Sequence, residues 1–407
     1  MPNTELNKIK TPRVAITGMG IISAIGNSVE SNKKALFASE NGIGNITLIN
    51  TIHLDAIKVG EVKLSNEALI SALQLSENNN FSRTALLGLF AAKAAVKNSG
   101  IKDISAYKTG LISATTVGGM DKTELYLKQF ESNPKIQKYI ASHHAGDSTQ
   151  KIADALGIID FVTTISTACS SATNAIMLGA RFIKSGKLDR VIVGGTDALS
   201  KFTINGFKTL MIQSEELCKP FDANRNGLNL GEAAAYLVLE SEQIAIKENK
   251  PILAYVSGYA NANDAFHQTA SSHNGEGAFL AMDKALQNAS LLPRDINYIN
   301  AHGTATPNND LSESVAIKRI FEDKVPDFSS TKAFTGHTLA AAGAVEAVFS
   351  VLALQEQVVF PNINFETEIP ETGLKPVTEL KRNQIQNVLS NSFGFGGNCS
   401  TLILSKA

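Results

Sequence analysis

The sequence of 407 residues contains no tryptophan, and aromatic residues make up only 6% of it. It also lacks an excess of either charge, because 37 lysines and arginines stand against 38 aspartates and glutamates. This balance argues against a nucleic-acid partner and against a disordered acidic tail. Apolar residues make up 43% of the chain, which is enough to build a large globular core.

Cysteine is scarce as well. The three cysteines, Cys169, Cys218 and Cys399, are widely separated and odd in number. This pattern excludes a disulfide framework, and no CxxC pair offers a zinc site. We therefore expect a cytoplasmic protein without a bound metal, and we interpret Cys218 as structural.

No stretch combines the length and the lack of charge that a membrane-spanning helix needs. The longest apolar segment, 338–359, contains two glutamates and predicts a buried core helix. Near the N-terminus, Lys8, Lys10 and Arg13 precede an apolar run at 14–25, as in a signal peptide. Glycines interrupt this run and no good cleavage site follows it, so we interpret it as a buried strand and a turn.

Short β-branched runs alternate with alanine-rich helical patterns along the whole chain, which predicts a layered α/β fold. Strands are expected at 14–18, 109–115, 161–167, 190–194, 235–239, 253–259, 296–301, 333–335, 388–392 and 400–404. Helices are expected at 83–99, 147–156, 170–184, 275–289, 312–320 and 339–354. A charged stretch at 240–251 predicts two closely packed halves, 13–250 and 251–407.

Cys169 lies between a predicted strand and a predicted helix, in the sequence Thr-Ala-Cys-Ser-Ser. A thiol at the N-terminus of a helix lies near free N–H groups and the positive end of the helix dipole, so we expect a lowered pKa. The small neighbouring residues leave room for an acyl group. The segment alone is equally compatible with a buried cysteine that acts only as a small apolar side chain.

Two histidines have matching positions. His302 follows the strand expected at 296–301, and His337 follows the one expected at 333–335. Open α/β sheets bind ligands at the C-terminal ends of their strands. Either histidine alone could be structural, but two of them together with Cys169 favour a functional site.

Two charged residues and a glycine-rich turn accompany the histidines. Lys332 and Glu346 are expected to be buried, so they need each other or the histidines as partners. The turn at 391–398, Asn-Ser-Phe-Gly-Phe-Gly-Gly-Asn, could offer N–H groups to an oxyanion and an aromatic side chain as a gate, or could be a plain tight turn. By contrast, Gly18-Met-Gly20 lacks the third glycine of a dinucleotide-binding motif.

Taken together, these residues resemble the β-ketoacyl-acyl-carrier-protein synthases, in particular the type II (elongating) condensing enzymes of the thiolase superfamily. The resemblance extends from about Arg13 to Leu404. It is carried by Lys332 and by the segments 14–20, 167–171, 219–222, 301–304, 306–310, 336–337, 341–343 and 391–397.

The resemblance implies a duplicated βαβαβαββ fold with five layers, α-β-α-β-α. It implies an acyltransferase that joins an acyl chain to malonyl-acyl-carrier-protein, with loss of carbon dioxide, in fatty acid or polyene and polyketide synthesis. No cofactor is expected, because the substrates arrive on the phosphopantetheine arm of the carrier protein. The implied partners are acyl carrier protein and a second subunit, in a homodimer or in a heterodimer with a chain-length subunit.

The resemblance also assigns roles to individual residues. The predicted catalytic residues are Cys169, His302, His337, Lys332 and Glu346. Cys169 would hold the acyl chain as a thioester, the two histidines would act as neutral donors to the malonyl carbonyl, and Lys332 and Glu346 would orient them. The N–H groups of Cys169 and Phe395 would form the oxyanion hole, with Phe395 as the gate. The predicted substrate-binding residues are Thr304, Thr306, Thr269, Val117 and Phe393.

Some positions depart from the family's pattern. Asn398 and Cys399 follow the glycine-rich turn where Thr-Asn is usual, and acidic residues occur near 213–216 where arginine is common. Two alternatives to an elongating synthase remain. A non-catalytic chain-length subunit typically lacks the nucleophile, whereas Cys169 is present, and a carbon–carbon-cleaving thiolase would need a second catalytic cysteine.

Overall fold

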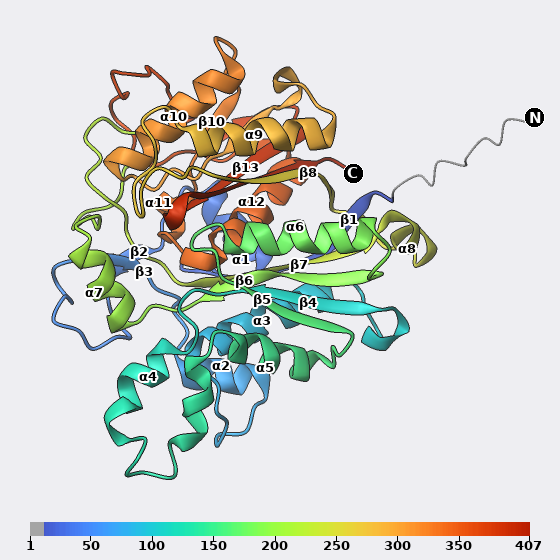
Figure 1. Ribbon diagram of the computed structural model, residues 1–407, viewed down its shortest axis with the longest axis vertical. Coiled ribbons are helices and arrows are strands. Elements are labelled where there is room, and N and C mark those ends of the chain that lie inside the picture. Colours follow the sequence, from blue (N-terminus) through green and yellow to red (C-terminus); the bar gives the residue numbers. More distant parts are fainter. Residues whose placement is uncertain (1–11) are drawn as a thin grey trace, which may run out of the picture.

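Figure 1 shows the computed structural model, which describes residues 12–407. Each half of the chain contributes five strands to a mixed sheet. In the first half the spatial order is β1 (Val14–Ile22), β7 (Ala233–Ser241), β6 (Arg190–Asp197), β4 (Thr109–Ala114) and β5 (Phe161–Ile165). In the second half it is β8 (Ala254–Asn263), β14 (Asn398–Ser405), β13 (Asn387–Gly394), β9 (Tyr298–Asn300) and β10 (Asp327–Ser329).

The two halves repeat one topology. In each, the first pair and the second pair of neighbouring strands are antiparallel, and the last two pairs are parallel. A short antiparallel contact between β1 and β8 joins the two sheets into one continuous order of strands. The duplicated fold that the family resemblance implies is therefore present. The division of the chain at residue 250 stays a prediction.

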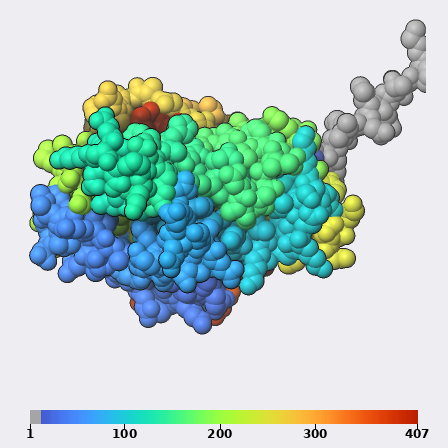
Figure 2. Space-filling view, turned by 90° about the horizontal axis from the view of Figure 1, so that it is seen from below, coloured from blue at the N-terminus to red at the C-terminus, as the bar shows by residue number. Residues whose placement is uncertain are grey.

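Helices form the other three layers (Figure 1). The middle layer consists of α6 (Ser171–Lys184) and α12 (Ala342–Glu356), which contact each other between the two sheets. One outer layer contains α3 (Arg83–Asn98) and α5 (Gly146–Leu156), and the other contains α9 (Glu276–Ala289) and α10 (Pro307–Phe321). The face seen in Figure 2 is formed mostly by the first half of the chain.

The remaining elements are short. The helices are α1 (Val29–Phe37), α2 (Asn66–Leu73), α4 (Met120–Tyr126), α7 (Lys201–Thr209), α8 (Glu242–Lys247) and α11 (Lys332–Thr335). Two small hairpin-like pairs are β2 (Ile43–Asn45) with β3 (Lys58–Gly60), and β11 (Val358–Val359) with β12 (Lys381–Arg382). Short 3₁₀ helices lie at Ile104–Ala106, Leu127–Gln129, Gln137–His143, Pro293–Asp295, Leu339–Ala341 and Phe395–Gly397.

Helix α12 is buried from Ala342 to Leu354. A helix packed on all sides has to be apolar all round, which accounts for its alanine, valine and leucine content. The segment Leu339–Glu356 is the one described helical stretch that is apolar and long enough to cross a membrane, and 89% of it is buried inside the protein. The prediction of a core helix here is confirmed.

The predicted buried strand near the N-terminus is also confirmed, because every residue of β1 is buried. Lys8 and Lys10, which suggested a signal peptide, lie outside the described residues.

One predicted strand is wrong. Residues 333–335 form part of α11 rather than a strand. The preceding strand β10 already pairs with β9, so the sheet position expected for 333–335 is filled by 327–329. The chain then makes one helical turn, and Gly336, with φ 71° and ψ 175°, ends it immediately before His337.

The Gly18-Met-Gly20 sequence has a packing role. β1 packs directly on α3 at these glycines. A Cβ atom on Gly18 would lie 2.6 Å from the carbonyl oxygen of Ala95, and one on Gly20 would overlap the carbonyl oxygen of Ala91. The two glycines therefore allow a close approach of strand and helix.

We expect Gly20→Ala to lower the free energy of unfolding by about 3 kcal/mol, because the added methyl group forces β1 and α3 apart. Gly44→Ala, at a position where a Cβ atom meets nothing within 4 Å, is the control and should change it by less than about 0.5 kcal/mol. Urea denaturation measures both variants. Equal effects of the two substitutions would contradict the packing role.

Candidate active site

Cys169 lies in a tight turn between β5 and α6. Ala168, the residue before it, has φ 52°, a left-handed conformation that non-glycine residues rarely adopt. The Ser171 hydroxyl holds this turn, because it accepts a hydrogen bond from the Thr167 N–H (2.8 Å) and donates one to the Ala168 carbonyl. Strained backbone of this kind is typical of functional sites, where the cost of the unfavourable conformation is accepted because it orients one side chain, here that of Cys169.

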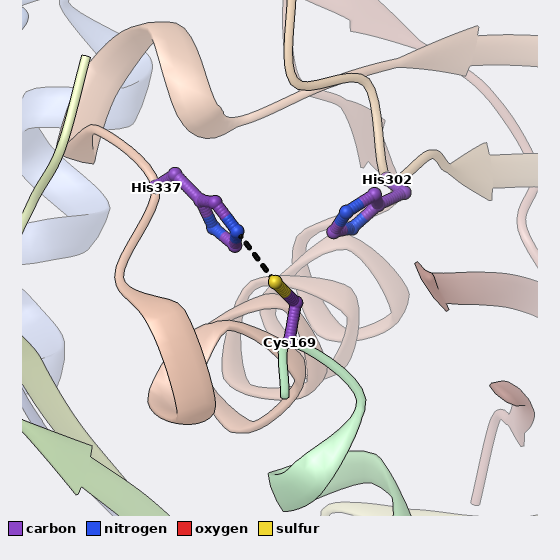
Figure 3. A group of neighbouring side chains, drawn as sticks. All are labelled: Cys169, His302 and His337. Atoms are coloured by element: carbon purple, nitrogen blue, oxygen red, sulfur yellow. Dashed lines mark hydrogen bonds between the residues drawn. The ribbon is translucent and has the colours of Figure 1, made fainter. Parts of the chain in front are cut away.

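Three predicted catalytic side chains meet at this turn (Figure 3). The Sγ atom of Cys169 is 2.9 Å from Nε2 of His337. The ring of His302 faces the edge of the His337 ring, with 5.5 Å between the ring centroids. All three side chains are buried. Residues far apart in sequence are thus brought together as the sequence predicts.

Lys332 lies behind His302. Its Nζ atom is 3.2 Å from Nδ1 of His302 and donates hydrogen bonds to the His302 carbonyl oxygen and to the carboxylate of Glu346. An ammonium group can only donate, so Nδ1 of His302 accepts and its ring proton is on Nε2. No such contact fixes His337, whose Nδ1 atom has no hydrogen-bond partner among the described residues.

Burial sets the protonation of the two histidines. Desolvation lowers the pKa of His302 and of His337 well below 6.5, and the charge of Lys332 lowers both further. Both rings are therefore neutral at pH 7. A neutral imidazole can accept a proton at one nitrogen while it donates at the other, which suits proton transfer.

Burial outweighs the lowering of the Cys169 pKa that we expected from the helix N-terminus. Burial raises the pKa of the Cys169 thiol to about 12, although Lys332 and the backbone N–H act in the opposite direction. The prediction of a lowered pKa is wrong because the turn is dry as well as close to a helix N-terminus. The thiol therefore rests protonated, next to a neutral nitrogen that can accept its proton.

Two cavities meet at Cys169. The first has a volume of about 280 Å³ and the second about 490 Å³. The first cavity is lined by the predicted site residues Cys169, Thr269, His302, Thr304, Thr306, His337, Phe393 and Phe395. The second cavity is mostly apolar, and its lining includes Val117, Met120, Cys169, Phe202, Leu339 and Phe395. Lys332 and Glu346 line neither cavity and lie behind the histidines.

Phe395 and Phe207 line both cavities. Their rings stack, with centroids 6.0 Å apart and an angle of 23° between the planes. The pair thus lies at the boundary of the two cavities, which Cys169 also lines. Phe207 comes from α7 and was not identified from the sequence, where it reads as one more apolar residue of a short helix.

Two buried carboxylates were also missed. Glu313 accepts hydrogen bonds from the N–H groups of His302 (2.9 Å) and Gly303 (2.8 Å), so it holds the loop that carries His302. Asp197, at the end of β6, accepts from the N–H groups of Val117 (3.0 Å) and Ala340 (2.9 Å). An acidic residue within an otherwise apolar strand or helix face is the signal that could have found them.

The ligand atoms of Cys169, His302 and His337 all lie within 4.8 Å of one another, close enough to hold a metal ion. The positive charge of Lys332, 3.2 Å from one nitrogen of His302, opposes a second cation at this position. We therefore interpret the cluster as a site for thiol chemistry. A thiol beside a neutral imidazole, at the junction of two cavities, suits an acyltransferase.

Comparisons with known proteins agree with this class. The family models "Beta-ketoacyl synthase, N-terminal domain" and "Beta-ketoacyl synthase, C-terminal domain" match residues 11–245 and 253–366. The chain is 35% identical to 3-oxoacyl-[acyl-carrier-protein] synthase 2 of Staphylococcus aureus (strain N315), over 97% of this chain and 98% of that protein. The chain belongs to the β-ketoacyl synthase family.

Solved structures are similar over nearly the whole chain. The ishigamide ketosynthase/chain length factor has a TM-score of 0.91 at 29% identity, and covers 98% of this chain and 100% of its own. A type II polyketide ketosynthase in complex with its acyl carrier protein has a TM-score of 0.88 at 26% identity, with the same coverage. These likenesses confirm the thiolase-like fold.

Burial raises the pKa of Glu346 to about 7, with Lys332 opposing the shift. The folded protein therefore binds the Glu346 proton more tightly than the unfolded chain, whose carboxylic acid has a pKa of about 4.5. This binding stabilises the fold fully below pH 4.5, and the stabilisation is lost as pH rises from 4.5 to 7, by up to about 1.4 kcal/mol per pH unit. The neutral histidines act in the opposite sense below pH 6.5. We therefore expect the difference in unfolding free energy, wild type minus Glu346→Gln, to fall steadily between pH 4.5 and 7.

Urea denaturation at a series of pH values measures this difference. The Glu371→Gln variant, which removes an exposed carboxylate in the same way, is the matched control. A pH-independent difference for Glu346→Gln would contradict the raised pKa.

Proposed function

We propose that the protein is a β-ketoacyl-acyl-carrier-protein synthase, which lengthens an acyl chain by decarboxylative condensation with malonyl-acyl-carrier-protein. One observation carries the proposal: Cys169 lies where the two cavities meet, with its Sγ atom 2.9 Å from Nε2 of a neutral histidine. A thiolate is both a good nucleophile and a good leaving group, which this chemistry requires.

In the first half-reaction, Cys169 takes the acyl chain from its carrier. His337 Nε2 accepts the thiol proton as sulfur attacks the thioester carbonyl, and the carrier thiol leaves with that proton. The acyl chain then lies in the apolar second cavity, in contact with Val117 and Leu339. The high pKa of the resting thiol makes His337 essential to this step.

In the second half-reaction, a malonyl thioester enters the first cavity. The Nε2–H groups of His302 and His337 donate to its carbonyl oxygen while the bond to the carboxylate breaks and carbon dioxide leaves. The electron pair of that bond forms an enolate, which attacks the carbonyl carbon on Cys169. The N–H groups of Cys169 and Phe395 hold the resulting oxyanion, and the Cys169 thiolate is then expelled. The thiolate takes up a proton from water, which replaces the proton that left with the carrier thiol and restores the resting thiol.

The tautomers support these roles. Lys332 fixes the proton of His302 on Nε2, so this ring is always a donor toward the substrate. The partnerless Nδ1 atom of His337 allows that ring to accept in one half-reaction and to donate in the other. Lys332 and Glu346 therefore act as positioning residues, and Glu313 holds the His302 loop from the other side.

The first cavity suits the phosphopantetheine arm of a carrier protein. Thr269, Thr304 and Thr306 offer hydroxyl groups to its amides, and Phe393 gives it an apolar wall. Phe395, stacked on Phe207, is the gate between the arm and the acyl chain. We expect no further cofactor, because the carrier supplies the activated group.

The free edge of β5 suits a second subunit. β5 lies at one end of the strand order and is half-exposed along its length, and Ile159 just before it is 90% exposed. Unpaired edge strands tend to pair with another chain. We propose a homodimer through β5, with a chain-length subunit as the alternative partner, in the cytoplasm and in either fatty acid or polyene and polyketide elongation.

Incubation with a panel of acyl-carrier-protein thioesters should add the mass of one acyl group to the intact protein. We expect Cys169→Ala to gain no mass, because it lacks the nucleophile, whereas Cys218→Ala should gain mass as the wild type does. Intact-protein mass spectrometry measures all three. A gain in Cys169→Ala, or no gain in any protein with any donor, would contradict the proposal.

Val117→Phe should shift acylation toward shorter chains, because the larger side chain fills part of the 490 Å³ cavity. We expect a loss of about ten-fold in kcat/KM for the longest donors, with little change for acetyl, since one misplaced aromatic ring costs about 1.4 kcal/mol or more. Leu125→Phe, at a 58% exposed position, is the control. Equal losses for all donors would contradict a role in chain length.

A further inference from the structure

Asp197 is fully buried at the end of β6 and lines neither cavity. β6 pairs in parallel with β4 (Figure 1), and the Asp197 carboxylate reaches the turn that follows β4. Its Oδ1 atom accepts hydrogen bonds from the Thr115 hydroxyl and from the N–H groups of Thr116 (3.1 Å) and Val117 (3.0 Å). Its Oδ2 atom accepts from the Thr116 hydroxyl (2.6 Å) and from the N–H of Ala340 (2.9 Å). Both oxygens are thus engaged, and the carboxylate cannot turn without losing bonds.

The groups that Asp197 binds belong to two walls of the second cavity. Thr116 and Val117 line this cavity from the turn after β4, in the first half of the chain. Leu339, the residue before Ala340, lines it from the second half. One carboxylate therefore anchors a wall segment from each half.

The backbone of Leu339 is strained. This leucine is 4% exposed and has φ 54°, in the left-handed region that side chains other than glycine rarely adopt. Such a conformation persists only where the surrounding structure fixes it. The bond from Ala340 to Asp197 fixes the peptide group that follows Leu339, and so it helps to keep the Leu339 side chain in the cavity wall.

We propose that Asp197 is a positioning residue that sets the length of the acyl chain that the second cavity accepts, because it holds Val117 and Leu339 in place. The proposal rests on the function proposed above. A chain that is too long can enter only if a wall moves. Moving either wall breaks a buried hydrogen bond to Asp197 and leaves a polar group unpaired. The limit on chain length therefore depends on this carboxylate as well as on the size of the wall side chains.

Asp197→Asn tests the proposal. A carboxamide nitrogen cannot accept a hydrogen bond, and the N–H groups of Val117 and Ala340 can only donate. In either orientation of the asparagine amide, one of these two N–H groups loses its acceptor, so one wall is released. We expect the ratio of kcat/KM for the best donor to that for donors too long for the wild type to fall about ten-fold.

Asp222→Asn is the matched control. Asp222 is also fully buried and accepts hydrogen bonds from the backbone N–H groups of Asn224, Glu366 and Thr367, but it lines neither cavity. Acylation rates with carrier-protein thioesters of increasing length, followed by intact-protein mass spectrometry, give the ratio for each variant. A general loss of folded protein lowers the rates with all donors by the same factor, so the ratio should stay as in the wild type.

Thr115→Val is a milder second variant. It removes one donor to the carboxylate and leaves the backbone N–H groups on Asp197 in place. Thr115 does not line either cavity, so the substitution does not change the wall directly. We expect the same ratio to fall about three-fold, as for the loss of one ordinary hydrogen bond.

An unchanged ratio in Asp197→Asn, or an equal change in Asp222→Asn, would overturn the proposal. If Asp197→Asn does not fold, an unchanged ratio in Thr115→Val would overturn it. The proposed function fails separately: no acylation of the wild type by any donor would remove that function and this proposal with it. Normal acylation with an unchanged ratio would remove only the role of Asp197.

Discussion

The buried ammonium group of Lys332 is the interaction on which the site depends. It joins three elements, because it touches the ring and the carbonyl of His302, belongs to α11, and pairs with Glu346 of α12. A charge in a dry interior is costly unless it is paired and fully hydrogen-bonded. Its partners are therefore fixed in place, and the orientation and tautomer of His302 are fixed with them.

The five-layer fold excludes water from the site and so sets the protonation of its side chains. Cys169, His302, His337 and Glu346 are all buried between the two sheets, next to the middle helices. Burial drives each of them toward its neutral form, which lowers the pKa of the histidines and raises that of the thiol and the carboxylic acid. The three side chains that face the substrate are therefore neutral at rest, with the Lys332–Glu346 pair behind them, and burial keeps water away from an enolate formed there.

Much of the fold and the site could be predicted from the sequence. The alternation of strands and helices indicated the layers, and Cys169, His302 and His337 were identified because each lies at a strand or helix end. Residues 333–335 were misjudged, because their β-branched and aromatic character could not show that 327–329 fills the same place in the sheet. The pKa of Cys169 was misjudged because depth of burial cannot be read from local sequence. Asp197, Glu313 and Phe207 were missed because their importance comes from long-range contacts.

The duplication places the nucleophile and its proton acceptor at equivalent positions of the two halves. Cys169 precedes α6 in the first half, and His337 precedes α12 at the corresponding junction of the second half. Two copies of one strand–helix junction thus supply the nucleophile and its proton acceptor, and they meet only because the middle helices pack against each other. The chemistry is divided between the two repeats, so neither half alone contains both the nucleophile and its proton acceptor. A change in how α6 packs on α12 would change the distance between Sγ of Cys169 and Nε2 of His337. Substitutions at this interface between the repeats would therefore alter the rate of acyl transfer.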